Sequence, residues 1–440
     1  MITKNLLILE FVSGGGYNKL EIPTSLFCEG YAMLRTIIED FKNLGFEITT
    51  LLDERIHHLS PYLKSDEVKF VKKKDDFLTK YSECVQNSTF CFIIAPEFSK
   101  ILYNLTQIVN KYKKRLLSVD INGILLGTSK FESHKFFNRY KLNSPRTYKI
   151  PLKNGTIDVE FVLEKFHQLG GSIIIKPDDG VGSELVFHFK TQDQIVQFFK
   201  DNEEKLNIDR CYIVQEYIEG DNLSVSLFNM TDPKKREVMK KVILSINNQE
   251  IKRLASNQGF LYMGGSSPVK DYELIKNKLE KLLNQMDLKN FKGYFGIDFI
   301  KKNDESIYFI EINPRLTTSY IGIRNILDYN PLVLLSDEYN SDIKLPELKF
   351  GRFSHFVRLE LNYSGNEMFE DIINVIIPEI IDLVPEIVTP PFTLQNLKIN
   401  EELPFSCFIS TKEKNEKASY GRIAQIKTIF KEYNFDLLNC

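Results

Sequence analysis

Two carboxylates and one amide stand at chemically useful spacings between Gly293 and Arg315, where two apolar runs flank the polar turn Asn303–Ser306. A hairpin centred between positions 304 and 305 would place Asp298 opposite Glu311, with Asn313 on the same face. Facing carboxylates destabilise a sheet unless a cation lies between them. Oxygen ligands of this kind suit Mg²⁺, which also binds substrate phosphates. The spacing therefore predicts a magnesium site; the alternative is a solvent-facing strand with scattered acids.

A lysine and a glycine-rich turn upstream could bind phosphate. The predicted strand Ile173–Pro177 contains Lys176 and leads into the turn Asp178–Glu184. The candidate contacts in that turn are Asp179, Gly180, Gly182 and Ser183. Glycines let backbone N–H groups approach an anion, and a lysine adds a positive charge. Because no G-K-[ST] sequence opens a helix here, the pattern favours a flap over the phosphates instead of a P-loop; a plain hairpin is the alternative.

The segment Tyr212–Gly220 predicts a strand that leads into a short apolar linker. Free backbone N–H and C=O groups in such a linker can bind the edge of an adenine, and polar side chains nearby can hold a ribose. A buried core strand is the alternative for this segment. Upstream of it, Lys130 opens a predicted helix directly after the short polar sequence Gly127–Ser129.

The elements that would position these residues fall into three parts. Residues 1–127 alternate strands and helices with short connections, which predicts a parallel α/β domain. Residues 128–345 hold the candidate residues above, with a lid subdomain at about 135–215. Residues 346–440 predict a C-terminal α+β extension, broken at Pro390-Pro391, which either completes the substrate domain or forms a homodimer contact. The expected fold class is therefore α/β and α+β.

The composition is that of an ordinary globular protein. The 440 residues are 43% hydrophobic and 26% charged, with a net charge of −2, so no strong field attracts nucleic acid or an anionic membrane. No apolar run is long enough to span a bilayer, and the N-terminus lacks a cleavage site. The six cysteines form no C-x-x-C pair and favour free thiols. We expect a cytoplasmic protein that binds neither nucleic acid nor membrane.

Taken in order along the chain, these motifs resemble the ATP-grasp superfamily over residues 128–330. The resemblance implies an ATP-grasp fold preceded by an N-terminal parallel α/β domain, with ATP as the nucleotide and Mg²⁺, usually as two ions. It also implies that Lys130 and Lys176 contact the α- and β-phosphates, while the turn at 178–184 closes over the γ-phosphate.

The same resemblance assigns the adenine and ribose contacts. It implies that the adenine pocket is lined by Gln215, Glu216, Tyr217 and Ile218. An acid two residues after position 220 often binds the ribose in such ligases. Here that position is Asn222, with Asp221 just before it, so the ribose contact is open between the two.

Metal and catalytic roles follow from the resemblance as well. Asp298, Glu311 and Asn313 would hold magnesium. Lys176 would be catalytic in addition to binding phosphate. Arg315 would touch the transferred phosphate or an acyl phosphate.

Four N-terminal segments are similar to the ATP-grasp group that contains the tyramine–glutamate ligase of methanofuran biosynthesis: Leu9–Gly16, Ser25-Leu26, Glu29–Leu34 and Leu52–Arg55. Gly14, Gly15 and Gly16 lie between a strand and a helix, where an anionic substrate group could bind the helix N-terminus. Asp53 or Glu54, at the carboxyl end of a strand, could bind an amine substrate. A structural turn and a loop acid are the respective alternatives.

The chemistry that the resemblance implies is carboxylate activation. The γ-phosphoryl group would pass to a carboxylate, and an amine would attack the acyl phosphate to form an amide. We therefore expect an ATP-dependent carboxylate–amine ligase, acting on glutamate with a small amine or a cofactor precursor of a methanofuran- or tetrahydromethanopterin-type C1 carrier. An ATP-grasp kinase or phosphotransferase, and a catalytically silent nucleotide-binding regulatory protein, are the alternatives.

Overall fold

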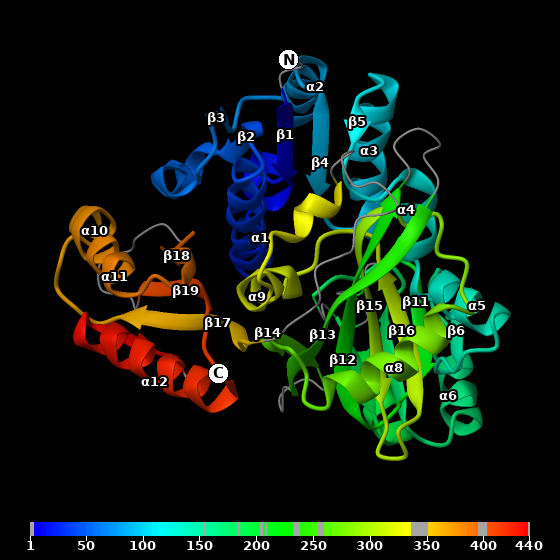
Figure 1. The fold of residues 1–440 in the computed structure, drawn as a ribbon. Coiled ribbons are helices and arrows are strands. Elements are labelled where there is room, and N and C mark those ends of the chain that lie inside the picture. The colour runs from blue at the N-terminus through cyan, green and yellow to red at the C-terminus, as the bar shows by residue number, and fades with distance from the viewer. Residues whose placement is uncertain are drawn as a thin grey trace.

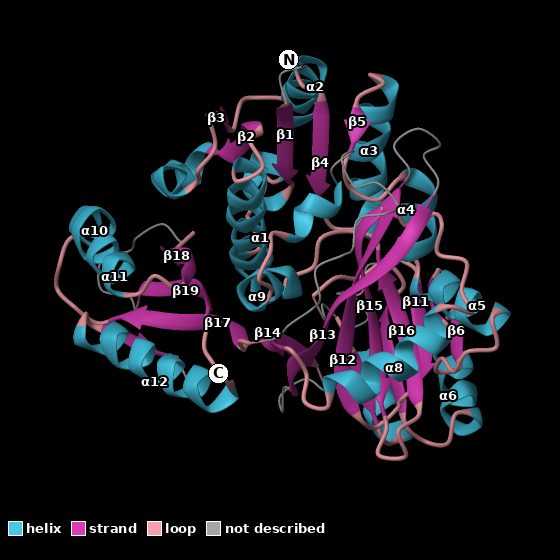
Figure 2. Ribbon diagram, viewed as in Figure 1, coloured by secondary structure: helices cyan, strands magenta, loops and turns pink. Residues whose placement is uncertain are grey.

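The computed structural model describes residues 4–153, 155–182, 185–202, 206, 209–231, 238–253, 259–335, 351–394 and 403–438. In Figure 1 the N-terminal part is blue, the middle of the chain is cyan to yellow, and the C-terminal part is orange to red. Helices flank each of the sheets (Figure 2).

The N-terminal part is a parallel five-stranded sheet in the order β3-β2-β1-β4-β5. Its strands are β1 (Asn5–Glu10), β2 (Glu47–Asp53), β3 (Glu67–Val71), β4 (Phe90–Ile94) and β5 (Arg115–Leu116). Its helices are α1 (Thr24–Lys42), α2 (Phe77–Asn87) and α3 (Ile101–Lys111). Strands β1 and β4 are nearly all buried, as apolar runs in a parallel sheet covered on both faces should be. The predicted parallel α/β layer is therefore confirmed.

A four-stranded antiparallel sheet, in the order β10-β9-β11-β6, carries the predicted lysine strand. Its strands are β6 (Thr147–Lys149), β9 (Ile173–Pro177), β10 (Phe187–Phe189) and β11 (Tyr212–Glu216). The helices before and around it are α4 (Ile121–Thr128), α5 (Lys130–Arg139), α6 (Val159–Gln168) and α7 (Gln192–Asn202), and β7 (Leu152–Lys153) pairs with β8 (Thr156–Ile157). This sheet and its helices have a hydrophobic cluster of their own, between Ile150 and Val214.

The largest sheet joins the middle and the end of the chain, because β14 pairs with β17. Its strands are β12 (Asp221–Thr231), β13 (Val238–Arg253), β14 (Phe260–Ser267), β15 (Gly293–Lys301), β16 (Ile307–Asn313), β17 (Ser354–Tyr363), β18 (Ile387–Phe392), β19 (Leu403–Ser410) and β20 (Phe435–Leu437). Its helices are α8 (Tyr272–Leu283), α9 (Ser319–Ile326), α10 (Phe369–Asp371), α11 (Ile377–Leu383) and α12 (Glu416–Glu432).

The break predicted at Pro390-Pro391 is wrong, because both prolines lie inside β18. This strand is at the edge of the sheet, and its register with β19 is irregular on either side of Thr389. Proline has no N–H to donate, and an edge strand tolerates that loss on its open side.

Helix α1 connects the N-terminal part to the C-terminal strands. Arg35 Nη1 donates to the carbonyl oxygens of Ile387 and Val388, each at 3.0 Å. Thr389 Oγ1 donates to the Cys28 carbonyl oxygen at 2.7 Å. The C-terminal strands therefore pack against the helix that forms one wall of the site described next.

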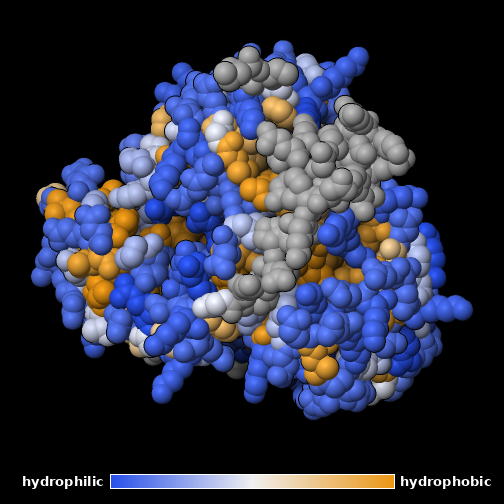
Figure 3. Space-filling model, viewed as in Figure 1, coloured by the Kyte–Doolittle hydropathy of each residue, from blue (hydrophilic) through white to orange (hydrophobic). Residues whose placement is uncertain are grey.

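Hydrophilic side chains cover most of the face drawn in Figure 3, and a hydrophobic group lies on its left, over α10 and α11. Exposed hydrophobic residues on this part of the chain are Met368, Val375 and Leu383. Within the described ranges, no helix is both long and apolar enough to cross a membrane.

Candidate active site

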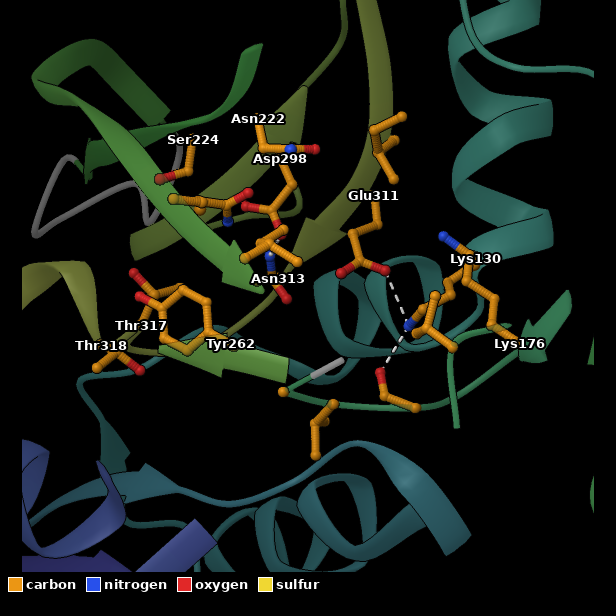
Figure 4. Close-up of a pocket in the computed structure, with 18 of the residues that line it drawn as sticks. Lys130, Lys176, Asn222, Ser224, Tyr262, Asp298, Glu311, Asn313, Thr317 and Thr318 are labelled. Carbon is orange, nitrogen blue, oxygen red and sulfur yellow. Dashed lines mark hydrogen bonds and ion pairs between the residues drawn. The ribbon is translucent and has the colours of Figure 1, made fainter. Parts of the chain in front are cut away.

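A cavity of about 290 Å³ lies where the parallel N-terminal sheet, the four-stranded antiparallel sheet and the large sheet meet. Most of the predicted site residues line it, and they come from segments far apart in the sequence. Those residues are Lys130, Lys176, Gly180, Gly182, Gln215, Glu216, Tyr217, Ile218, Asn222, Asp298, Glu311, Asn313 and Arg315. Figure 4 shows the hairpin carboxylates and both lysines together on one side of this space.

The β15–β16 hairpin brings the predicted oxygen ligands together. Asp298 pairs directly with Glu311, and Asn313 Nδ2 donates to Asp298 Oδ2 at 3.1 Å. The turn itself differs from expectation: Lys302 N–H donates to the carbonyl of Ser306, which centres the turn on residue 304. A bulge between Asp298 and Phe299 adds one residue on β16 and restores the predicted pairing.

Two lysines approach these carboxylates, Lys176 from strand β9 and Lys130 from the start of helix α5. Lys130 Nζ lies 2.8 Å from Glu311 Oε2 and donates to the Gly180 carbonyl oxygen at 2.6 Å. Burial lowers the pKa of Lys176 to about 8, assisted by the positive charge of Lys130. Burial also opposes the charge on Lys130, but Glu311 outweighs it and raises that pKa. The site without nucleotide thus holds one lysine in a firm ion pair and one that loses its proton readily.

Asp178 anchors the glycine turn to the start of α5. Its Oδ1 accepts the Phe131 N–H at 2.8 Å, and its Oδ2 accepts the Ser129 hydroxyl at 2.8 Å. A carboxylate at a helix N-terminus is favoured by the helix dipole. The neighbouring Asp179 lies outside the cavity lining; its Oδ1 accepts from Arg210 Nε at 3.0 Å. Ser183, the last predicted contact in this turn, lies outside the described residues.

The predicted adenine linker lines the cavity. It runs from β11 into β12, and the ring of Tyr217 stacks on His188 with centroids 3.9 Å apart. Glu216 is held by Arg146, whose Nε lies 3.0 Å from its Oε2. Of the two ribose candidates, Asn222 lines the cavity. Asp221 is 3.4 Å from Lys301 Nζ, outside the lining.

Arg315 is held in place by a glutamate from the N-terminal part. Arg315 Nε donates to Glu97 Oε1 at 2.9 Å, and the two side chains are 14% and 5% exposed. Glu97 follows β4, so the carboxyl end of the parallel sheet contacts the end of the β15–β16 hairpin. Glu97 could not be predicted from the sequence, because an acid in a loop after a strand has no pattern that distinguishes it from a solvated one.

The predicted substrate glycines do not line the cavity. They form a tight turn in which Gly15 has φ of 94°, and a Cβ there would meet Val71 at 2.5 Å. A Cβ on Gly16 would meet Phe11 at 2.3 Å, so close packing requires these glycines, including Gly14 beside Leu9. This placement matches the structural alternative weighed for the glycine run.

The glycine turn binds a carboxylate of the protein itself. Backbone N–H groups of Val12 and Ser13 donate to the carboxylate of Glu10 at 3.0 and 2.7 Å. Asp53 is also engaged, because Arg55 Nη2 lies 2.8 Å from its Oδ2. Neither Asp53 nor Glu54 lines the cavity.

Other residues of the same part form the cavity wall instead. They include Glu10, Glu29 and Gly30, with Tyr262 and Thr318 from the large sheet and its connecting loop. Glu10 had a usable signal, since it is an acid within the apolar run Leu6–Val12 and ends the buried strand β1. Glu29 had no such signal in the sequence, because charged residues are common on helices.

The donor set fits a hard divalent cation. Among the described residues no three His, Cys, Asp or Glu side chains group together, so the ligands here are two carboxylates and an amide. Burial and the facing Glu311 raise the pKa of Asp298. Burial also acts on Glu311, but Lys130 and Lys176 outweigh it and lower that pKa. Lys130 lowers the pKa of Asp298 but does not outweigh burial and Glu311, and Mg²⁺ would supply further positive charge there.

Two family models match this chain. Residues 128–319 match the family model of the ATP-grasp domain, and residues 46–124 match that of the pre-ATP-grasp domain. The chain belongs to the ATP-grasp superfamily. The first match contains Lys130 and Lys176, the glycine turn at 178–184 and the β15–β16 hairpin.

Two curated relatives are tyramine–L-glutamate ligases. The protein from Methanocaldococcus jannaschii is 26% identical over 353 residues, covering 78% of this chain and 92% of the relative. That from Methanocaldococcus fervens is 28% identical over 326 residues, covering 72% and 89%. These relatives belong to the group that the N-terminal motifs predicted.

A solved structure with the same fold is the biotin carboxylase domain of the Hydrogenobacter thermophilus 2-oxoglutarate carboxylase, determined with MgADP and bicarbonate. It has a TM-score of 0.68 at 13% identity, covering 100% of this chain and 91% of that one. The ATP-grasp fold and the enzyme class, an ATP-dependent carbon–nitrogen ligase, are therefore confirmed. ATP and Mg²⁺ are supported as well, while the number of ions stays a prediction.

Proposed function

We propose that this ATP-grasp ligase joins a carboxylate of L-glutamate to a small amine through an acyl phosphate, with tyramine as the first amine to test. The observation that carries the proposal is one continuous cavity. It is lined by the lysines, by the hairpin oxygens and by residues of the N-terminal part, among them Glu29. Both curated relatives, which the match covers almost completely, are named for these two substrates.

The protein's own groups would act in sequence on the phosphates. Lys130 and Lys176 place positive charge beside the α- and β-phosphates, and the turn carrying Gly180 and Gly182 covers the γ-phosphate. A substrate carboxylate oxygen attacks the γ-phosphorus, the bond to the bridging oxygen breaks, and ADP leaves. Such transfer depends mainly on positioning and on neutralising charge. Arg315, fixed by Glu97, would contact the transferred phosphoryl group.

The second step forms the amide. The amine nitrogen attacks the acyl carbon, inorganic phosphate leaves with the bonding electrons, and the nitrogen releases a proton. Closure of the cavity excludes water, which would otherwise hydrolyse the acyl phosphate. Asp298, Glu311 and Asn313 would hold Mg²⁺, in our proposal two ions, which neutralise charge on the phosphate oxygens.

Further parts of the proposal concern the nucleotide contacts and the context of the protein. Asn222 would hold the ribose, and the linker at 216–218 the adenine. We place the domain boundaries near residues 127 and 345, and we propose that the product serves a methanofuran-type C1 carrier. A cytoplasmic location and a homodimer also stay predictions; light scattering on the purified chain tests the dimer.

The test is ADP and phosphate release by the purified protein with MgATP, L-glutamate and tyramine, omitting each substrate in turn. ADP formation that requires glutamate, together with the mass of a glutamyl-amide, is the expected result. Hydroxylamine in place of the amine should trap the acyl phosphate as a hydroxamate. A phosphorylated product without amide would favour the kinase alternative, and tight MgATP binding without turnover of any amine would favour the regulatory one.

A further inference from the structure

Glu29, on the wall that α1 contributes to the cavity, has no part in the nucleotide chemistry. Its side chain is 13% exposed and lines the same space as Asp298 and Glu311. Its Oε2 accepts a hydrogen bond from Thr318 Oγ1 at 3.1 Å. Its Oε1 lies 3.6 Å from Arg358 Nη1. One weak and one moderate contact leave this carboxylate able to accept further hydrogen bonds.

The position of Glu29 suits a small substrate that also reaches the phosphates. Thr318, its hydrogen-bond donor, follows Arg315 by three residues, so their Cα atoms are at most about 10 Å apart. Tyr262 lines the same cavity as Glu29 and Asp298. Figure 4 shows it beside Thr317 and Thr318, facing the hairpin residues.

Tyr262 offers a second unused group at this place. Its side chain lines the cavity, and within the described ranges its hydroxyl has no hydrogen-bond partner. A hydroxyl can donate and accept, so a polar ligand in this space would satisfy it. The carboxylate and the hydroxyl together form a polar end of the cavity that the phosphate chemistry does not explain.

This end of the cavity is short of positive charge. Arg358 is shared, since its Nε lies 2.7 Å from Glu360 Oε1, closer than its contact with Glu29. Arg315 is engaged by Glu97. Four carboxylates therefore surround two guanidinium groups: Glu10, Glu29, Glu97 and Glu360 around Arg315 and Arg358. Burial raises the pKa of Glu29, and Arg358, Thr318 and Arg315 oppose this rise without cancelling it.

We propose that Glu29 binds the primary ammonium group of a substrate, assisted by the Tyr262 hydroxyl and positioned by Thr318 and Arg358. The inference rests on the proposed ligase function and identifies how that site recognises its substrate. The ammonium group is either the α-ammonium of the amino acid or that of the amine. The glycine turn is not an alternative site for the substrate, because the Glu10 side chain already occupies it.

The test compares Glu29→Gln with Glu39→Gln, a glutamate of the same helix whose partners are Lys64 and Arg324 and which does not line the cavity. Calorimetry would measure the binding of L-glutamate and of tyramine in the presence of a non-hydrolysable MgATP analogue. A charge-assisted hydrogen bond is worth a tenfold change in affinity or more. Glu29→Gln should weaken one of the two ligands by about tenfold or more and leave nucleotide affinity within about twofold.

Analogues without the ammonium group identify its source. If Glu29 binds the amino acid, the wild-type protein should prefer L-glutamate to glutarate, and Glu29→Gln should lose that preference. If Glu29 binds the amine, the same should hold for tyramine against 4-ethylphenol. Glu29→Asp, which keeps the charge, should retain more of the preference than Glu29→Gln.

Equal binding of both ligand pairs to wild type and Glu29→Gln would overturn the proposal. Should Glu29→Gln not fold, the wild-type protein still decides: no preference for either ammonium-bearing ligand over its analogue overturns the proposal as well. Binding does not require turnover, so these results are separate from a failure of the ligase function. That failure would appear as ligand binding with no amide product.

Discussion

Asp298 and Glu311 face each other across the β15–β16 hairpin because two irregularities offset one another. The turn is centred on residue 304, half a residue before the position that a uniform hairpin requires. The bulge beside Phe299 inserts Ile310 and brings the carboxylates back into register. Ile310 itself lines the cavity, so the bulge also supplies part of the wall. A bulge that re-aims side chains is common beside active sites.

Removal of either carboxylate should abolish metal-dependent turnover. We expect Glu311→Ala to lower kcat at least about a hundredfold. The variant lacks one ligand for Mg²⁺, so the negative charge of the phosphates is no longer neutralised. The magnesium dependence of ADP release measures this effect, and EDTA should stop the wild-type reaction. Glu305→Gln, in the exposed turn of the same hairpin, is the matched control. Unchanged activity of Glu311→Ala would refute the metal role.

Nucleotide affinity should fall as the pH rises through 8. Lys176 has a pKa of about 8 in the protein without nucleotide, so its ammonium form, present below that value, is lost above it. Phosphate oxygens favour the charged form, so ATP binding at pH 8.5 should take up protons. Calorimetry in buffers of different ionisation enthalpy detects this uptake. Lys176→Arg remains charged, and its binding should show neither the uptake nor the pH dependence.

Loss of Glu97 should impair catalysis more than nucleotide binding. Glu97→Gln removes the charge that holds Arg315. Removing one partner of a buried ion pair lowers the folding stability by about 3–5 kcal/mol. We expect a lower unfolding temperature and a lower kcat with nearly unchanged KM for ATP. Asp66→Asn, which breaks an exposed pair with Lys42, should change neither kinetic parameter. A normal kcat in Glu97→Gln would contradict a positioning role.

Gly30 should not tolerate a methyl group. A Cβ there would lie 2.7–2.8 Å from the carboxyl atoms of Glu10, whose side chain is fixed by hydrogen bonds from Val12 and Ser13. Gly30→Ala should therefore destabilise the protein by about 1–3 kcal/mol. Gly421→Ala, in α12 with nothing within 4 Å, should instead stabilise it by about 0.5–1 kcal/mol. Urea unfolding of the two variants checks the opposite signs.

The sequence by itself determined the elements and the order of the site residues. Strand and helix periods are local, so the start of α5 at Lys130 follows from the local pattern. Spacing also predicted the pairing of Asp298 with Glu311, although the bulge beside Phe299 is needed to produce it. The order of these motifs then led to the ATP-grasp superfamily, which the family models confirm.

Tertiary structure decided which of two neighbouring side chains enters the cavity. Successive residues of a strand point to opposite faces, so only the packing of β12 against β15 selects Asn222 over Asp221. Likewise Asp178 caps a helix, while Asp179 turns to Arg210. The acidic end of the cavity around Glu29 needed three distant segments to meet, and no local pattern encodes such a meeting.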